Sequence, residues 1–100
     1  MLSAVYRAVA KDELQKAFYW YEEREPGLGS EFLRSIEGTM QLIRRHPKMF
    51  PIIHKNIRQA VVRRFPYSIF YLIEAKKIVI LAIFHTSRNP SIWQQRQPSS

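Results

Sequence analysis

The spacing of hydrophobic residues along the sequence changes once in the first quarter of the chain, from a strand-like to a helical pattern. Residues 3–9 are rich in β-branched and aromatic side chains, which is typical of a short strand. From residue 10 onward the apolar side chains recur at helical spacing. Asp12 and Glu13 are expected in the first turn of this helix, where acidic groups interact favourably with the helix dipole. The helix is predicted to end near Arg24, because a Pro-Gly pair follows shortly after it.

A second amphipathic helix is predicted from Leu28 to Arg45, since its apolar residues step by three or four positions. Two arginines occupy its last turn and Pro47 lies just beyond, and both features are typical of a helix end. The connection between the two helices is short, which favours an antiparallel helical hairpin. Residues 46–56 contain two prolines and are predicted to form a loop.

Three strand-like segments make up most of the second half of the chain. Pro66 separates the first two, because proline cannot donate to a ladder of strand hydrogen bonds. A tight hairpin at Ala75-Lys76 is predicted to join the second and third. The third is apolar at nearly every position, as in a central strand. The predicted strands are residues 57–65, 67–74 and 77–85.

The order of these segments predicts an α+β domain of the form β-α-α-β-β-β. An N-terminal strand is followed by a helical hairpin packed on one face of an antiparallel sheet. A short C-terminal helical turn is expected, with Asn89 as N-cap and Pro90 at its first position. The other face of the sheet is expected to be partly open. A single domain is predicted over residues 1–97, with residues 98–100 as a frayed tail.

Composition excludes several classes of protein. Hydrophobic residues make up 46% and charged residues 24% of the chain, as in ordinary globular proteins. There is no cysteine, which excludes disulfides and thiolate sites and fits a reducing cytoplasm. The longest strongly apolar run, Ile78–Phe84, is far too short to span a bilayer. The first residues lack the pattern of a signal peptide, so a cytoplasmic location with no membrane partner is expected.

Positive charge is concentrated in the second half of the chain. Residues 1–50 carry eight Lys and Arg against seven Asp and Glu, a net +1. Residues 51–100 carry eight against one, a net +7. Such a surface attracts nucleic acid, an acidic protein or an anionic membrane. A soluble domain that happens to be basic remains the alternative interpretation.

The segment after the last predicted strand carries the best candidates for chemistry. His85 is either a general acid or base or a phosphate contact, or a strand-end histidine bonded to the backbone. Arg88 can grip phosphate or carboxylate with two bonds, or it forms a salt bridge to an acid of the first helix such as Glu22 or Glu23. The histidines are scattered, with no metal-ligand spacing, so neither a metal nor a cofactor is expected.

Basic and aromatic residues interleave on the predicted sheet and at its edges. Arg63 and Arg64 are adjacent on a predicted strand, so they should point to opposite faces. Tyr19, Trp20 and Tyr21 span too wide an arc of the first helix to be buried together, and Tyr19 or Trp20 is expected at an edge beneath a partner. The candidates for contact with a target or partner are Arg63, Arg64, Tyr67, Arg88, Trp93, Arg96, Tyr19 and Trp20.

Four ordered segments resemble the RelE/ParE superfamily of toxins from bacterial type II toxin–antitoxin modules. The resemblance extends from about residue 4 to residue 96. It is carried by Tyr19-Trp20-Tyr21-Glu22-Glu23, then Pro26-Gly27-Leu28-Gly29 before Phe32, then Arg64-Phe65-Pro66-Tyr67-Ser68-Ile69-Phe70-Tyr71, and finally Ile83-Phe84-His85 with Arg88-Asn89-Pro90 and Trp93.

The resemblance implies one of two activities. RelE-like toxins cut mRNA on the ribosome without a metal, using basic side chains with a general acid or base. ParE-like toxins inhibit DNA gyrase and carry no hydrolytic site. Members of both branches are neutralised by an antitoxin that wraps the toxin, here expected to be a small acidic protein encoded next door.

The sequence departs from the RelE pattern at three positions that would carry basic groups, namely Gln59, Val61 and Ser68. Losing even one such electrostatic donor costs about 10²–10³ in rate. The favoured hypothesis is therefore a ParE-like, non-enzymatic gyrase inhibitor. The alternative is an mRNA endonuclease with His85 as acid or base and Arg64 and Arg88 as phosphate ligands. A basic nucleic-acid-binding domain is a third hypothesis, outside the family.

Overall fold

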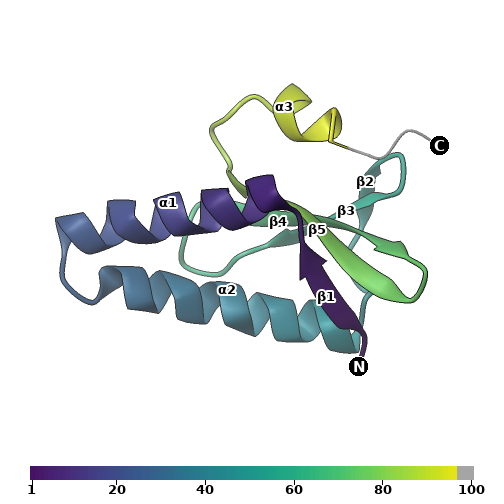
Figure 1. Ribbon diagram of the computed structural model, residues 1–100, viewed down its shortest axis with the longest axis horizontal. Coiled ribbons are helices and arrows are strands. Elements are labelled where there is room, and N and C mark those ends of the chain that lie inside the picture. The colour runs from purple at the N-terminus through teal and green to yellow at the C-terminus, as the bar shows by residue number, and fades with distance from the viewer. Residues whose placement is uncertain (97–100) are drawn as a thin grey trace.

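An N-terminal strand, a helical hairpin, four further strands and a short helix follow one another in the computed structural model, which describes residues 1–96 (Figure 1). The five strands form one sheet in the order β1-β5-β4-β3-β2. The α+β architecture predicted from the sequence is thereby confirmed. The elements are β1 (Ser3–Tyr6), α1 (Ala8–Arg24), α2 (Leu28–Arg45), β2 (Ile52–His54), β3 (Ile57–Val61), β4 (Tyr67–Glu74), β5 (Lys77–His85) and α3 (Ser91–Gln94).

The sheet is mixed, whereas the sequence predicted an antiparallel one. Strands β2 to β5 are antiparallel to their neighbours, but β1 pairs with β5 in parallel. No hairpin joins β1 to β5, because both helices and three strands lie between them in the chain. Their relative direction therefore depends on tertiary packing, which local patterns do not encode.

Several element boundaries also differ from the predictions, and strand β1 ends at Tyr6 instead of residue 9. Helix α1 begins at Ala8, two residues early, so Asp12 and Glu13 lie beyond its first turn. Strand β2 forms inside the predicted loop 46–56. Strand β3 ends at Val61 instead of continuing to residue 65, because the chain turns before Pro66 and Arg64 has a left-handed φ of 71°.

The helical face of the sheet holds most of the core. Helix α2 buries Phe32, Ile36, Met40 and Ile43 at helical spacing. The ring of Tyr21 in α1 lies 5.2 Å from that of Phe32, centroid to centroid. Figure 1 shows α1 and α2 running side by side as the predicted antiparallel hairpin.

The opposite face is covered by α3, and it is less open than predicted. Trp93 stacks on Phe70 with ring centroids 4.0 Å apart, and a second apolar cluster forms around the two rings. The Asn89 side chain accepts a hydrogen bond from the Ser91 backbone N–H at 3.0 Å, but the N-cap of this turn is Pro90 and not Asn89 as predicted. The turn begins at Ser91, one residue later than expected.

No helix within residues 1–96 is both long enough and apolar enough to cross a membrane. The predicted domain limit at residue 97 and the predicted frayed tail, residues 98–100, lie outside the described residues.

Candidate functional site

Glu13 of α1 is the centre of an ion cluster that joins α1 to the C-terminal segment. Its Oε1 accepts bonds from Arg96 Nη1 at 2.9 Å and from the Ile83 backbone N–H at 3.1 Å. Its Oε2 accepts bonds from Arg96 Nη2 at 3.1 Å and from Arg88 Nη1 at 3.3 Å. The Glu13 side chain is only 10% exposed, so this carboxylate depends on these donors.

The position of this cluster follows from the length of β1. Strand β1 ends beside Ile80, so the backbone of β5 beyond that point has no strand neighbour on that side. Glu13 accepts from the Ile83 N–H, and Arg96 donates to the Leu81 carbonyl at 3.3 Å. These two side chains supply hydrogen bonds that a longer β1 would have made.

The two arginines on Glu13 differ in their freedom. Arg96 makes two contacts with the carboxylate and its side chain is 17% exposed. Arg88 makes one longer contact, is 47% exposed, and stacks over Phe84 with its guanidinium carbon 4.5 Å from the ring centroid. Arg88 does pair with an acid of the first helix, but that acid is Glu13, and not Glu22 or Glu23 as considered from the sequence.

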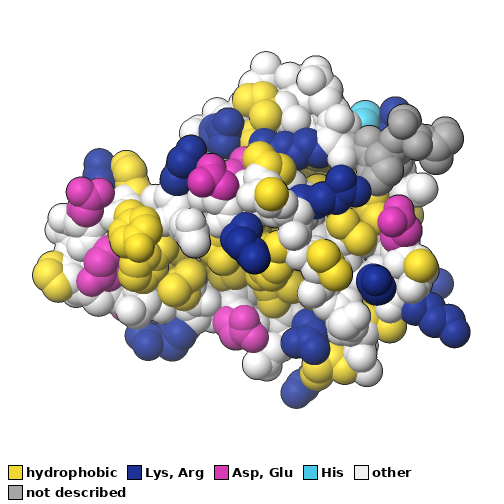
Figure 2. Space-filling view, viewed as in Figure 1, with side chains coloured by type: hydrophobic (Ala, Val, Ile, Leu, Met, Phe, Trp, Pro, Cys, Tyr) yellow, Lys and Arg dark blue, Asp and Glu magenta, His cyan; other side chains and the backbone are white. Residues whose placement is uncertain are grey.

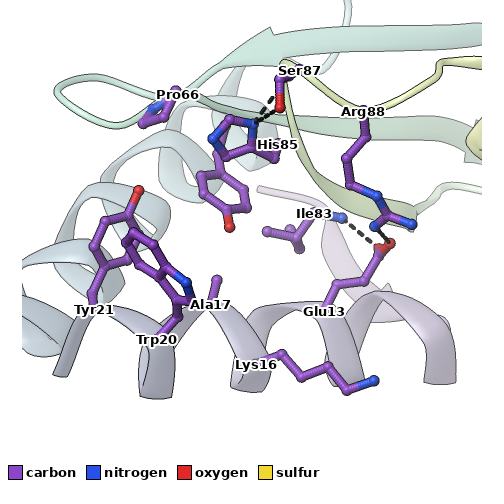
Figure 3. A pocket seen from close by; sticks show the side chains of 11 residues that line it. Glu13, Lys16, Ala17, Trp20, Tyr21, Pro66, Ile83, His85, Ser87 and Arg88 are labelled. Atoms are coloured by element: carbon purple, nitrogen blue, oxygen red, sulfur yellow. Dashed lines mark hydrogen bonds and ion pairs between the residues drawn. The ribbon is translucent and has the colours of Figure 1, made fainter. Parts of the chain in front are cut away.

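A cleft of about 500 Å³ opens between α1 and the ends of β4 and β5 (Figure 3). Trp20 and Tyr21 form one wall, and Pro66 and His85 lie opposite (Figure 3). Arg88 and Lys16 bring positive charge to this cleft. The Thr86 backbone N–H donates to the Pro66 carbonyl at 2.9 Å, which ties the end of β5 to the turn before β4.

The hydrogen bonds of His85 define its tautomer. Its Nδ1 accepts a bond from the Ser87 backbone N–H at 3.0 Å and lies 2.8 Å from the Ser87 hydroxyl (Figure 3). A backbone N–H can only donate, so the proton of the neutral ring is on Nε2. The nitrogen that remains available is therefore a donor, an arrangement that suits the binding of an anion better than general-base catalysis.

Tyr67 lies beside His85 on the cleft, with ring centroids 5.2 Å apart. Burial raises the pKa of the Tyr67 phenol, Tyr21 and Glu13 raise it further, and Arg88 opposes them. The hydroxyl is therefore protonated at neutral pH and available as a hydrogen-bond donor.

Arg63 and Arg64 are exposed but do not line this cleft. Since β3 has ended at Val61, the prediction that they point to opposite faces of a strand is wrong. Arg64 is directed to α2, where its Nη2 lies 3.1 Å from Glu31 Oε1. The structure therefore does not bring Arg64 together with His85 and Arg88.

Of the four remaining contact candidates, Tyr19, Trp20, Trp93 and Arg96, Trp20 alone lines the large cleft. Trp20 lines the cleft, with the Arg24 guanidinium carbon 3.3 Å above its ring, whereas its exposed neighbour Tyr19 does not line it. Trp93 is buried against Phe70, so its ring is not available on the surface. Arg96 does not line the cleft, and it contacts the cleft residue Glu13 through an ion pair.

A second, smaller cleft of about 240 Å³ lies on the α3 face and shares His85 and Arg88 with the first. Gln59 and Ser68 also line it, and the Gln59 amide donates to the Ser68 hydroxyl at 3.0 Å. Two of the positions where the RelE pattern would carry basic groups are therefore neutral and bonded to each other. Within residues 1–96 no group of three or more His, Asp or Glu side chains could hold a metal ion.

Glu13 is the functional residue that sequence reasoning missed. The sequence predicts Glu13 in a first helical turn, yet the residue contacts partners 70 to 83 positions away in the chain. A partial signal was present: Glu13 is adjacent to Leu14 and Ala17 on the apolar side of the helix, where an acid needs a cationic partner.

Comparison with solved structures finds a similar fold. A chain described as the chromosomal ParDE TA system from P. aeruginosa matches with a TM-score of 0.76 at 19% identity, covering 87% of this chain and 98% of that one. At this identity the match establishes the fold. No curated protein sequence matches the chain.

The family follows from a sequence model. The model of the ParE toxin of the type II toxin–antitoxin system, parDE, matches residues 5–90. The chain therefore belongs to the ParE toxin family, and the RelE/ParE resemblance inferred from its motifs is confirmed in its ParE-like branch.

Proposed function

We propose that this toxin inhibits growth by acting on DNA gyrase through the edge of the sheet around Arg88, without nuclease chemistry. A small acidic antitoxin encoded beside it neutralises the toxin by binding. A gyrase target also requires a cytoplasmic location. No cofactor takes part in this mode of action.

The observation that carries this choice is the dispersal of the groups that a nuclease would need. His85 uses its acceptor nitrogen on Ser87, which disfavours a role as general base. Arg64 is bonded to Glu31 and does not line the cleft that holds Arg88. A pentacovalent phosphate at this site would therefore meet one guanidinium, and its transition state would be poorly stabilised.

The target is tested with the purified chain in two parallel assays. We expect inhibition of gyrase supercoiling or accumulation of gyrase-cleaved DNA, and intact mRNA on ribosomes. Cleavage of ribosome-bound mRNA that disappears in His85→Ala would overturn the proposal in favour of the endonuclease. Binding of DNA with no effect on gyrase would instead support the plain nucleic-acid-binding domain.

The role of Arg88 is tested in cells by induced expression. Arg88→Ala should abolish growth inhibition, because a guanidinium keeps its charge and binds carboxylate or phosphate with two bonds. Arg88→Lys should restore inhibition only in part. The exposed ion pair predicts a change of less than about 1 kcal/mol in the unfolding free energy, so thermal melting is the control. Full growth inhibition by Arg88→Ala would exclude Arg88 from the site.

A further inference from the structure

The turn between β3 and β4, residues 62–66, presents two arginines to solvent from a well-anchored backbone. Val62 and Phe65 of this turn are buried in the core beneath the helical hairpin. The Phe65 ring packs edge-on against one aromatic ring of α1 and one of α2, with centroids 4.9 and 5.3 Å apart. Arg63 and Arg64 lie between these two anchors and are both exposed. The turn therefore holds their side chains at one place on the surface.

The backbone of this turn is strained at Arg64. Its φ of 71° lies in the left-handed region, which is unfavourable for a residue with a Cβ and which glycine adopts readily. The ion pair of Arg64 with Glu31 joins side chains that are 67% and 34% exposed, and such a pair stabilises a fold little. Glycine would therefore suit the fold at this position, and the arginine points to a role in binding.

Positive charge at the turn exceeds the acid that contacts it. Arg63 forms no ion pair with any residue in the part of the chain that the structure describes. Arg34 is also exposed and lies three residues after Glu31 in α2, a spacing at which helix side chains are neighbours. One carboxylate is thus accompanied by the guanidiniums of Arg34 and Arg64, with Arg63 beside them in the turn.

The turn lies next to the edge of the sheet that carries Arg88. Tyr67, which follows the turn, is paired with His85 in the ladder of β4 and β5. The Thr86 backbone N–H donates to the Pro66 carbonyl at 2.9 Å, so the turn is joined directly to the segment after β5. The arginines of the turn and Arg88 therefore lie at the same end of the sheet.

We propose that the turn of residues 62–66 binds the phosphate backbone of the DNA duplex on which gyrase acts, while the edge around Arg88 acts on the enzyme. The biological setting rests on the proposed action on gyrase, whereas the contact with DNA is a property of the toxin alone. A guanidinium keeps its charge and binds a phosphate with two bonds. Contacts of this kind position a protein on a duplex without reading its sequence.

A phosphate backbone fits this turn better than an acidic protein surface. The centre of a protein interface is built from apolar and aromatic side chains. At the turn Val62 and Phe65 are buried, and Pro66 alone adds exposed apolar surface. What the turn offers to a partner is therefore charge, and each cation that meets a phosphate releases counterions from the DNA.

The test measures binding of the purified toxin to a short labelled DNA duplex over a series of salt concentrations, by fluorescence anisotropy. The double variant Arg63→Gln/Arg64→Gln removes two charges from the turn. It should weaken binding by about tenfold or more at low salt and reduce the slope of log K against log salt by about 1.8, the value of two phosphate contacts.

The matched control removes two charges elsewhere on the surface. Lys48→Gln/Lys55→Gln changes exposed lysines on either side of β2, and Lys48 lies beyond the end of α2 that is opposite to Glu31. It should leave the slope unchanged. A double variant of the turn that binds DNA like the parent, or equal slopes for the turn variant and the control, would overturn the proposal.

A glycine at position 64 separates the side chain from the backbone. Arg64→Gly should raise the melting temperature by a few degrees, because the strain is relieved. It should weaken DNA binding as much as Arg64→Gln does. A lower melting temperature with unchanged DNA binding would contradict the proposal, because Arg64 would then serve the fold.

Gyrase assays distinguish this proposal from the proposed target. If DNA binding needs the two arginines but the parent toxin leaves gyrase active, the DNA contact stands and the target is wrong. If the parent inhibits gyrase and the double variant of the turn binds DNA like the parent, the target stands and the DNA contact is wrong. If that variant loses binding to gyrase free of DNA but still binds DNA like the parent, the turn binds an acidic protein surface instead.

Discussion

The two faces of the sheet are covered by elements of very different size. The hairpin of α1 and α2 covers one face along two long helices, and its core extends from Ala10 to Ile43 and onto the strands. The other face depends on α3, a helix of four residues whose Trp93 stacks on Phe70. The first interface distributes its stability over many side chains, whereas the second concentrates it in one indole and the Glu13–Arg96 ion pair.

The candidate site lies where these two covers meet. Arg88 follows β5 and borders both clefts. It contacts Glu13 of α1 and stacks on Phe84, which lies on the face of the sheet that α3 covers. Lys and Arg side chains gather between α1 and α3 in Figure 2, with hydrophobic side chains over the helical hairpin nearby. The helical hairpin on one face of the sheet therefore fixes the position of the site. The small helix α3 on the other face leaves its positive charge exposed.

The largest effect is expected from removing the indole of Trp93, which holds α3 on the sheet. Trp93→Ala should lower the unfolding free energy by about 3–5 kcal/mol, because a buried aromatic ring is replaced by a cavity. The matched control is Trp20→Ala, which removes the other, half-exposed tryptophan and should change stability by less than about 1 kcal/mol. Chemical denaturation of both variants measures the difference. Similar losses for the two tryptophans would contradict the contrast between the faces.

The next effect concerns the ion pair that fastens α3 to α1. Glu13→Gln keeps an oxygen acceptor for the Ile83 N–H but leaves Arg96 without its carboxylate in a largely buried position. The expected loss is about 2–3 kcal/mol, near the lower end for breaking a buried pair. Asp12→Asn breaks the exposed pair with Lys16 and should cost less than about 0.5 kcal/mol. Equal melting temperatures for the two variants would show that the Glu13–Arg96 ion pair does not stabilise the contact between α1 and the C-terminal segment.

Local patterns predicted those parts of the molecule that local physics determines. The bounds of α2, β4 and β5 coincide with the predictions, because amphipathic spacing, a tight turn and a terminal proline are all encoded within a few residues. The two-residue hairpin is real, with Ala75 and Lys76 at left-handed φ angles of 51° and 64°.

Strand β2 was missed for a local reason, since it is only three residues long, follows Pro51, and is defined by its pairing with the adjacent β3. Two other misses share a different cause, which is a dependence on partners distant in the chain. The parallel direction of β1 and the burial of Glu13 both depend on β5, more than 60 residues away. The ordered motifs and the positive charge pointed to the His85–Arg88 edge, but no local pattern could reveal the carboxylate that holds Arg88.

A moderate effect is expected at Gly29, where α1 and α2 approach each other closely. A Cβ at Gly29 would lie 2.8 Å from the ring and from the backbone carbonyl of Phe18, so α1 and α2 would have to separate. Gly29→Ala should lower stability by about 1–3 kcal/mol, the usual cost of overpacking. Gly38 of the same helix has open space around it, and Gly38→Ala should raise stability by about 0.5–1 kcal/mol. Opposite signs in thermal melts would confirm the close approach, and a gain in both variants would contradict it.

The smallest effect at neutral pH concerns Tyr71, which is fully buried in the core on the helical side, and it is accompanied by a loss of stability at high pH. Its hydroxyl donates to the Pro47 carbonyl at 2.7 Å, and burial raises its pKa from 10.0 to about 12, while Arg58 opposes the shift. Between these values the unfolded chain releases the phenolic proton and the folded chain retains it. Stability is therefore unaffected below about pH 10 and falls as the pH rises towards 12.

Tyr71→Phe should cost about 0.5–1.5 kcal/mol at neutral pH, the net value of one hydrogen bond. Its unfolding free energy should then fall less steeply than that of the parent between pH 10 and 12. Some fall should remain, because burial also raises the pKa values of Tyr6, Tyr21 and Tyr67. Denaturation of parent and variant at each pH isolates the Tyr71 contribution, since all other groups cancel in the difference. Parallel curves would mean that the Tyr71 phenol is as free to ionise in the folded chain as in the unfolded one, and that the packing around it is looser than the helical cover implies.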